Sequence, residues 1–313
     1  SDLIGGEYPL SAVTVGENTK NKGKAISIVF SMQGVGSFLA SLVFVGLLWA
    51  EIDYDLVWRI ALAAPILPTA IVLYMRAQSE ETEEYKANLQ QIENDPDGKK
   101  EAIKKLFSDK KWRFYLIGTA GSWLIFDIAF YANSLFNSTI TALLGLGTEP
   151  IHVSTNSLIL AAMALPGYFL AVLTINKIKR KDLQVIGFIM LVLLYLGLGL
   201  YHTQLDGMIV ISLYGLTYFF SNFGPNTSTY TVPGEIFPTI SRSTAHGISA
   251  ASGKVGAFLG AYLLKPLVDD FGLGNVLIIC AGLSLVGLLW TLIFIPSTPQ
   301  DQSEEKYANL VEE

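Results

Sequence analysis

The sequence predicts an all-α protein that crosses a membrane many times. Hydrophobic residue types make up 51% of its 313 residues, charged types make up 15%, and the mean hydropathy is +0.45. Soluble domains carry about 25% charged residues, so this composition argues against a soluble enzyme. It also argues against a disordered protein, because a chain this apolar would not stay solvated. The apolar residues gather in long segments, which are typical of membrane-spanning helices.

Eight of these segments are long enough to cross a bilayer, which takes ~20 mostly apolar residues in a helix. In chain order they are residues 25–50, 57–76, 113–135, 156–176, 183–201, 207–231, 245–266 and 274–296. A ninth apolar stretch, residues 3–15, is too short to cross and lacks the basic start of a signal peptide. We therefore expect the sequence to begin inside a helix of a longer protein.

The loops between the spans alternate in charge. Most of the Lys and Arg residues lie in every second loop, whereas the loops between them hold mainly acids such as Glu51 and Asp206. The basic loops are at residues 20–24, 76–113, 177–181 and 242. Cytoplasmic loops are enriched in basic residues, so we expect the basic loops and the C-terminus to lie in the cytoplasm.

One long polar segment, residues 78–111, divides the chain and predicts four parts. Two groups of six spans around a long basic loop are the layout of many transporters. On that layout, residues 1–77 are the remainder of an N-terminal helix bundle, comprising the end of helix 4 and helices 5–6, and residues 78–111 are a cytoplasmic linker. Residues 112–296 are a C-terminal six-helix bundle, helices 7–12, and residues 297–313 are a cytoplasmic tail. We expect this linker to be a solvated connection with a short amphipathic helix near residues 85–92. The alternative is that it has a regulatory or lipid-contacting role.

Asp127 is the clearest polar residue inside a span. It lies about 15 residues into its segment, near the expected midplane, where a charged side chain costs ~2.5–3.5 kcal/mol to insert. Trp123, Asp127 and Tyr131 are spaced i, i+4 and i+8, which places them on one helix face. We interpret Asp127 as a substrate or proton site. The alternative is an inert acid that is protonated or neutralised by a neighbouring helix.

Two further polar residues lie in the last third of the chain. Lys254 sits among Gly and Ala about one-third into its span, and could contact an anion or balance Asp127. The alternative is a lysine that extends to the membrane surface. Asn226 follows Gly224 and Pro225, which break the helical hydrogen-bond ladder where a cavity can form. It could donate to a phosphate oxygen, or satisfy carbonyls freed by a kink.

Gln33 and Tyr8 give weaker signals. Gln33 lies near the middle of its span between apolar residues, and Tyr8 stands beside Pro9 near two glycines. Single polar residues of this kind usually hold helices together, although they can also line a site.

Other functional classes find no support in the sequence. The net charge of −6 argues against nucleic acid as a partner, and a single cysteine, Cys280, excludes an intrachain disulfide framework or a cysteine-based metal cluster. No catalytic or nucleotide-binding motif is present, so we expect neither an enzyme nor a cofactor or metal. The histidines His152, His202 and His246 lie in loops or at span ends, and we expect His246 at the surface rather than in a proton relay.

Four blocks of the sequence form a recognisable pattern. They are GGEYPLSA at residues 5–12, FSMQGVG at 30–36, TAGSWLIFDIAFYANSLFNS at 119–138, and the segment 222–257. The first resembles the GGDYPLSA signature of the phosphate:proton symporters of the major facilitator superfamily, with Glu7 in place of Asp, and the others are similar to further blocks of that family. Their order fits helices 4, 5, 7 and 10–11 of a twelve-helix protein. The resemblance implies the major facilitator fold with helices 1–3 and the start of helix 4 missing.

The resemblance also implies a function and a site. It implies a proton-coupled secondary transporter that imports inorganic phosphate by alternating access, as a monomer in the lipid bilayer of the plasma membrane. The matching phosphate-binding positions are Tyr8, Gln33, Trp123, Asp127, Tyr131, Asn226 and Lys254. Protonation of Asp127 would govern phosphate binding and release.

Two other functions stay open. The chain could transport another solute, such as a glycerophosphodiester, a carboxylate or a sugar, although a sugar pocket would usually carry more amides and fewer charges. It could also be a phosphate sensor that does not transport, with the 78–111 segment and the acidic tail as its signalling surface. An embedded enzyme is less well supported, because no nucleophile–base set is visible.

Overall fold

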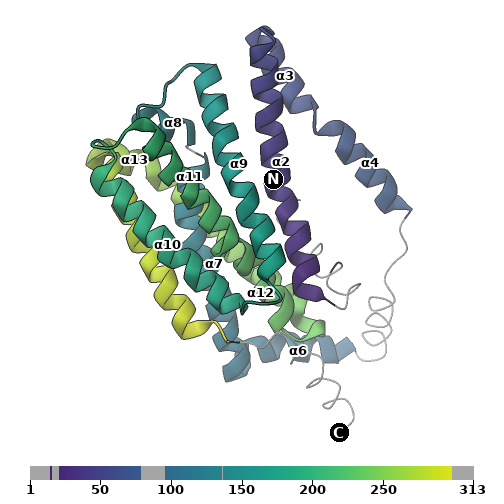
Figure 1. Cartoon of the computed structure of the whole chain (residues 1–313). Helices are drawn as coiled ribbons and strands as arrows, with labels where there is room; N and C mark the ends of the chain where they lie inside the picture. Colours follow the sequence, from purple (N-terminus) through teal and green to yellow (C-terminus); the bar gives the residue numbers. More distant parts are fainter. Residues whose placement is uncertain (1–14, 16–20, 79–95, 136, 298–313) are drawn as a thin grey trace.

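The computed structural model describes residues 15, 21–78, 96–135 and 137–297, and its regular elements there are all α-helices (Figure 1). In chain order they are α2 (Lys22–Trp49), α3 (Tyr54–Ala63), α4 (Ile66–Ala77), α6 (Pro96–Ser108), α7 (Lys110–Leu135), α8 (Asn137–Leu143), α9 (Pro150–Thr174), α10 (Arg180–Tyr201), α11 (Gly207–Phe223), α12 (Pro225–Ile236) and α13 (Thr239–Phe294). The predicted all-α architecture is therefore confirmed.

Six helical segments of the described chain are long and apolar enough to cross a membrane. Their outer faces carry large apolar side chains: Leu193, Phe258 and Ile293 are 58%, 65% and 62% exposed. Soluble monomers rarely expose contiguous apolar surface on this scale, whereas lipid tails cover it in a membrane. The chain is an integral membrane protein with several spans.

Four predicted spans match single helices, two others are each divided into two helices, and the last two are joined in one. The expected span 57–76 is divided into α3 and α4 next to Pro65, because proline lacks the amide that continues a helix. The expected span 207–231 is divided at Gly224 into α11 and α12. The last two expected spans join in α13, where Gly272 interrupts the helical backbone with a φ of 78°.

Glycines allow α7 and α13 to pack closely. A Cβ atom on Gly256 would collide with the carbonyl oxygen of Leu124, and one on Gly260 would collide with that of Ile128. Small residues let membrane helices approach backbone to backbone. The close approach places the Asp127 face of α7 against the Lys254 face of α13.

Helix α2 packs against α9 and α12, so a helix near the start of the chain lies beside helices from its second half (Figure 1). Gly34 makes room for the ring of Tyr168, because a Cβ atom there would lie 2.5 Å from Cδ2 of that ring. A buried cluster joins the two parts: Ile26, Phe30, Trp123, Tyr168, Tyr230 and Ala250.

Helix α6 lies across one end of the bundle (Figure 1). Its Leu106 is buried and packs with Leu116 of α7, Phe237 and Ala245. The amphipathic helix expected near residues 85–92 lies outside the described residues. The division of the chain into four parts stays a prediction.

Candidate functional site

The predicted stripe on α7 forms one wall of the candidate site. Trp123 and Asp127 are buried, 5% and 2% exposed, and Tyr131 is half-buried one turn further along. Oδ2 of Asp127 has no hydrogen-bond partner among the described residues. A buried carboxyl oxygen without a partner is costly to retain, which marks this position as one that a ligand or proton could complete.

Lys254 of α13 lies opposite this stripe. Its Nζ atom donates a hydrogen bond to the hydroxyl oxygen of Tyr131 at 3.0 Å and lies 5.0 Å from the centre of that ring. Lys254 also acts electrostatically on the Asp127 carboxyl, and the Trp123 side chain lies near that carboxyl. An ammonium, an indole N–H and a hydroxyl, close to a group that can carry a proton, are suited to bind an oxyanion.

Gly253 explains how Trp123 reaches this position. A Cβ atom at residue 253 would lie 2.6 Å from Nε1 of Trp123, so only glycine leaves room for the indole against α13. The glycine that precedes Lys254 therefore places the indole beside the cation.

Asn226 is held at the start of α12 by two hydrogen bonds. Its Nδ2 atom donates to the hydroxyl of Tyr168 at 3.0 Å and to Oδ1 of Asn222 at 2.7 Å. Gly224 makes the preceding break possible, because its Cα lies close to α10, where a Cβ would be 2.6 Å from Cα of Gly187. The break thus turns the amide of Asn226 into the interior, next to the aromatic cluster.

Aromatic rings connect this site with α2. Trp123 meets Tyr230 edge to face at 6.2 Å, Tyr230 stacks on Phe30 of α2 at 4.5 Å, and Phe30 meets Tyr168 at 5.9 Å. Sequence reasoning missed Phe30, Tyr168 and Tyr230. Tyr168 follows Pro166 and Gly167, which could have marked it, but Phe30 carries no signal in an apolar run.

Polar contacts continue from the rings toward the end of the bundle where α2 begins. The hydroxyls of Ser27 and Thr231 are 3.2 Å apart. Arg180 forms a two-point ion pair with Glu235, with Nη2 and Nε 2.8 and 2.9 Å from the carboxylate oxygens. Both side chains are largely buried, and Gly23 of α2 lies against them. The sequence indicated only a loop cation at residue 180.

The other expected site residues have different outcomes. Gln33 is exposed on α2, and Tyr8 lies outside the described residues. The expectation for His246 is wrong: it is fully buried, because α7 and α12 cover the end of α13 where it lies. Among the described residues, no cluster of His, Cys, Asp or Glu could hold a metal ion.

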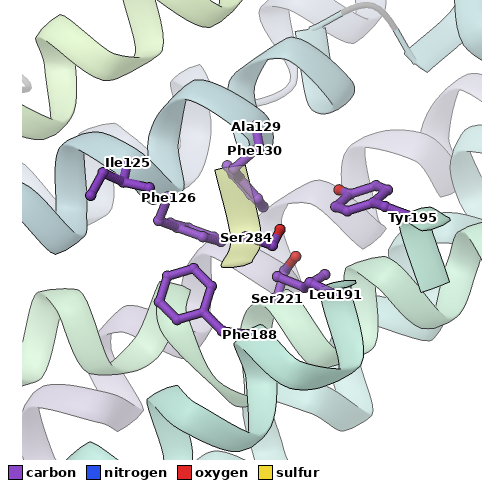
Figure 2. Close-up of a pocket in the computed structure, with 9 residues that line it drawn as sticks. All are labelled: Ile125, Phe126, Ala129, Phe130, Phe188, Leu191, Tyr195, Ser221 and Ser284. Atoms are coloured by element: carbon purple, nitrogen blue, oxygen red, sulfur yellow. The ribbon is translucent and has the colours of Figure 1, made fainter. Parts of the chain in front are cut away.

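A gap between helices α7, α10, α11 and α13 is separate from this site. Its lining comes from α7, α10, α11 and α13, as Figure 2 shows, and consists of Ile125, Phe126, Ala129, Phe130, Phe188, Leu191, Tyr195, Ser221 and Ser284. It has no room for a water molecule and its walls are mainly apolar. The gap is packed interior rather than a place for a solute.

Comparison with known proteins identifies the family. Residues 3–308 match the family described as "Sugar (and other) transporter". The chain is 36% identical to the probable inorganic phosphate transporter 1-6 of Arabidopsis thaliana, over 96% of this chain and 70% of the relative. It is 32% identical to the repressible high-affinity phosphate permease of Neurospora crassa and to the inorganic phosphate transporter PHO84 of Saccharomyces cerevisiae, over 96% of this chain and 66% and 64% of those relatives.

A solved structure shows the same fold. The proton:xylose symporter XylE, of the major facilitator superfamily, aligns with a TM-score of 0.76 over 96% of this chain and 70% of XylE, at 17% identity. The relatives are transporters and not enzymes. The chain belongs to the sugar and other transporter family, has the fold of the major facilitator superfamily, and is similar to inorganic phosphate transporters.

Proposed function

We propose that the protein imports inorganic phosphate together with protons by alternating access. The observation that carries the proposal is the buried Asp127 carboxyl, which faces Lys254 across the α7–α13 interface. Relatives named as phosphate transporters and a structural neighbour named as a proton symporter support it.

Phosphate would bind between the two halves of the full transporter, beside the faces of α7 and α13 that carry Asp127 and Lys254, with further donors from other parts of the chain. Lys254 supplies the positive charge, and Trp123 and Tyr131 supply an N–H and an O–H group. In the structure Tyr131 accepts a hydrogen bond from Lys254, and a phosphate oxygen would take over that role. The remaining proposed contacts are Asn226, Gln33 and Tyr8.

Proton coupling follows from the charge of Asp127. When the carboxyl is ionised it repels an anion beside it, and when it is protonated it can donate a hydrogen bond to phosphate. Proton binding and phosphate binding therefore favour one another, and thermodynamic linkage makes this effect equal in both directions. Loss of the proton on the cytoplasmic side restores the repulsion and favours release.

Alternating access would open the contacts between α2 and α12. The Ser27–Thr231 contact and the Phe30–Tyr230 stack close the interior at the end where α2 begins. The basic loops support a cytoplasmic position for this end. The structure would then be closed toward the cytoplasm, and rocking of the two halves would open it. The proposed setting is a monomer in the plasma membrane with a cytoplasmic C-terminus.

The experiment is phosphate uptake into proteoliposomes driven by a pH gradient. We expect Asp127→Asn to lose pH-driven accumulation, because the amide cannot release a proton. Asp270→Asn is the matched control, because Asp270 is an exposed acid of α13 next to the break at Gly272. Undiminished accumulation by Asp127→Asn would contradict the coupling role.

A sugar is the alternative solute that a specific observation favours, because the family description and XylE both name sugars. The positive charge of Lys254, beside an acid that can be protonated, favours an anion instead. Competition of labelled phosphate uptake by xylose, a carboxylate and a glycerophosphodiester separates these solutes. Phosphate binding without uptake would favour a sensor.

A further inference from the structure

His246 has surroundings that the proposed transport mechanism does not use. It lies in the first turns of α13, and residues 246, 250 and 254 are spaced i, i+4 and i+8. His246 therefore shares a helix face with Ala250 of the buried cluster and with Lys254 of the candidate site. Its side chain is fully buried.

A hydrogen bond to α12 fixes the tautomer of the imidazole. Nε2 lies 3.0 Å from the carbonyl oxygen of Tyr230 in α12. A carbonyl oxygen can only accept, so Nε2 carries the proton. Nδ1 is buried without a hydrogen-bond partner among the described residues. The ring is thus held at one atom, and that atom binds it to α12.

The same ring contacts both the site and the closed end of the interior. It meets Trp123 edge to face at 5.7 Å and 86°, and Tyr230 at 5.3 Å and 88°. Edge-to-face pairs at these distances are favourable and fix the relative orientation of the rings. Trp123 belongs to the candidate site, and Tyr230 stacks on Phe30 of α2. His246 lies between the two.

We propose that His246 is a positioning residue that orients Trp123 toward phosphate and holds Tyr230 against Phe30. Its N–H anchors the backbone of α12 at Tyr230, and its ring sets the angle of the indole. The proposal rests on the proposed function for its effect on phosphate, and on the structure alone for its effect on the contact between α2 and α12.

Two amide variants test the hydrogen bond with little change in polarity. The amide of His246→Gln can occupy the position of Nε2 and still donate to the Tyr230 carbonyl, whereas the shorter side chain of His246→Asn ends near Nδ1. A lost bond to a buried carbonyl weakens an equilibrium by roughly 5-fold or more. We expect His246→Asn to raise KM for phosphate by roughly 5-fold with kcat within about 2-fold. His246→Gln should restore most of the affinity.

The second measurement needs no phosphate. Ser27 is buried at the α2–α12 contact, and the natural cysteine Cys280 is buried, so Ser27→Cys provides a reporter whose maleimide labelling rate rises when that contact opens. His246→Asn should raise the labelling rate by roughly 5-fold, and His246→Gln should leave it close to that of the reporter alone. His152→Gln, at an exposed histidine, is the control for both measurements.

The outcomes separate the two proposals. Labelling rates and KM values in both variants that match those of the reporter alone and of the unsubstituted protein would overturn the role of His246. An equal defect in both would also overturn it, because the N–H would not matter. If the unsubstituted protein takes up no phosphate, the proposed function fails, and the labelling rates still decide the role of His246.

Discussion

Asp127 and Lys254 are ionisable residues inside helices that are otherwise largely apolar. Each would cost ~2.5–3.5 kcal/mol alone at the centre of a membrane helix. Their electrostatic interaction and the Tyr131 hydrogen bond reduce this cost, but Oδ2 of Asp127 stays without a partner among the described residues. A carboxyl oxygen left without a hydrogen-bond partner is expected where a ligand binds. In a pair with only a structural role, a further hydrogen bond to that oxygen would stabilise the fold.

Removal of the Lys254 cation should weaken phosphate binding directly. Hydrogen bonds to charged groups contribute ~1.5–3 kcal/mol, which corresponds to roughly 10- to 100-fold in affinity. We expect Lys254→Gln to raise KM for phosphate by at least about 10-fold in an uptake assay. Lys265→Gln removes an exposed lysine that pairs with Asp269 on the same helix, and it should leave KM unchanged. A KM equal to that of the unsubstituted protein would remove Lys254 from the site.

Sequence reasoning succeeded at single residues where one helix determines the outcome. The i, i+4, i+8 spacing was enough to place Trp123, Asp127 and Tyr131 on one face. It could not predict the Lys254–Tyr131 hydrogen bond or the Arg180–Glu235 ion pair, because these depend on which helices are neighbours. His246 was misjudged for the same reason: its place near a span end suggested exposure, and packing against α7 and α12 decides otherwise.

At the scale of elements, the contact between α7 and α13 gives the site its geometry. Gly253 admits the Trp123 indole, and Gly256 and Gly260 admit the α7 backbone. Any added side chain atom would push the two helices apart. Because Asp127 and Lys254 lie on opposite sides of this contact, helix packing and substrate binding depend on the same glycines.

One methyl group on Gly256 should therefore destabilise the protein. In Gly256→Ala the Cβ atom meets the carbonyl oxygen of Leu124, and overpacking of this kind costs ~1–3 kcal/mol. We expect a lower Tm for the purified protein in detergent. Gly282→Ala on the same helix is the matched control, because its Cβ meets nothing within 4 Å, and alanine favours a helix over glycine. Equal Tm values for the two variants would contradict the packing described here.

Helix positions were predictable from hydropathy, but helix breaks were not. The expected spans for α2, α7, α9 and α10 match because a span of ~20 apolar residues leaves little choice. The Gly224–Pro225 pair indicated an irregularity, yet the division into α11 and α12 depends on the close approach of Gly187 in α10. Local sequence records the possibility of a break, and the neighbouring helix determines its form.

At the scale of the whole molecule, α2 connects the N-terminal helices with helices from the second half of the chain. It packs against α9 and α12, and its Phe30 continues the row of rings that starts at Trp123. The proposed alternating access requires this surface to separate and the α7–α13 contact to persist. The contacts of α2 are made by large ring side chains, which can separate, whereas the glycines of the α7–α13 contact hold the two backbones close together.

The most direct test of the account is the pH dependence of phosphate affinity in the purified protein with and without the Asp127 carboxyl. Phosphate changes its own charge with pH, but that effect is the same for both proteins, so their difference isolates residue 127. The account predicts that the unsubstituted protein loses affinity more steeply than Asp127→Asn as pH rises, because only its carboxyl becomes an anion beside the phosphate. Parallel curves for the two proteins would contradict it.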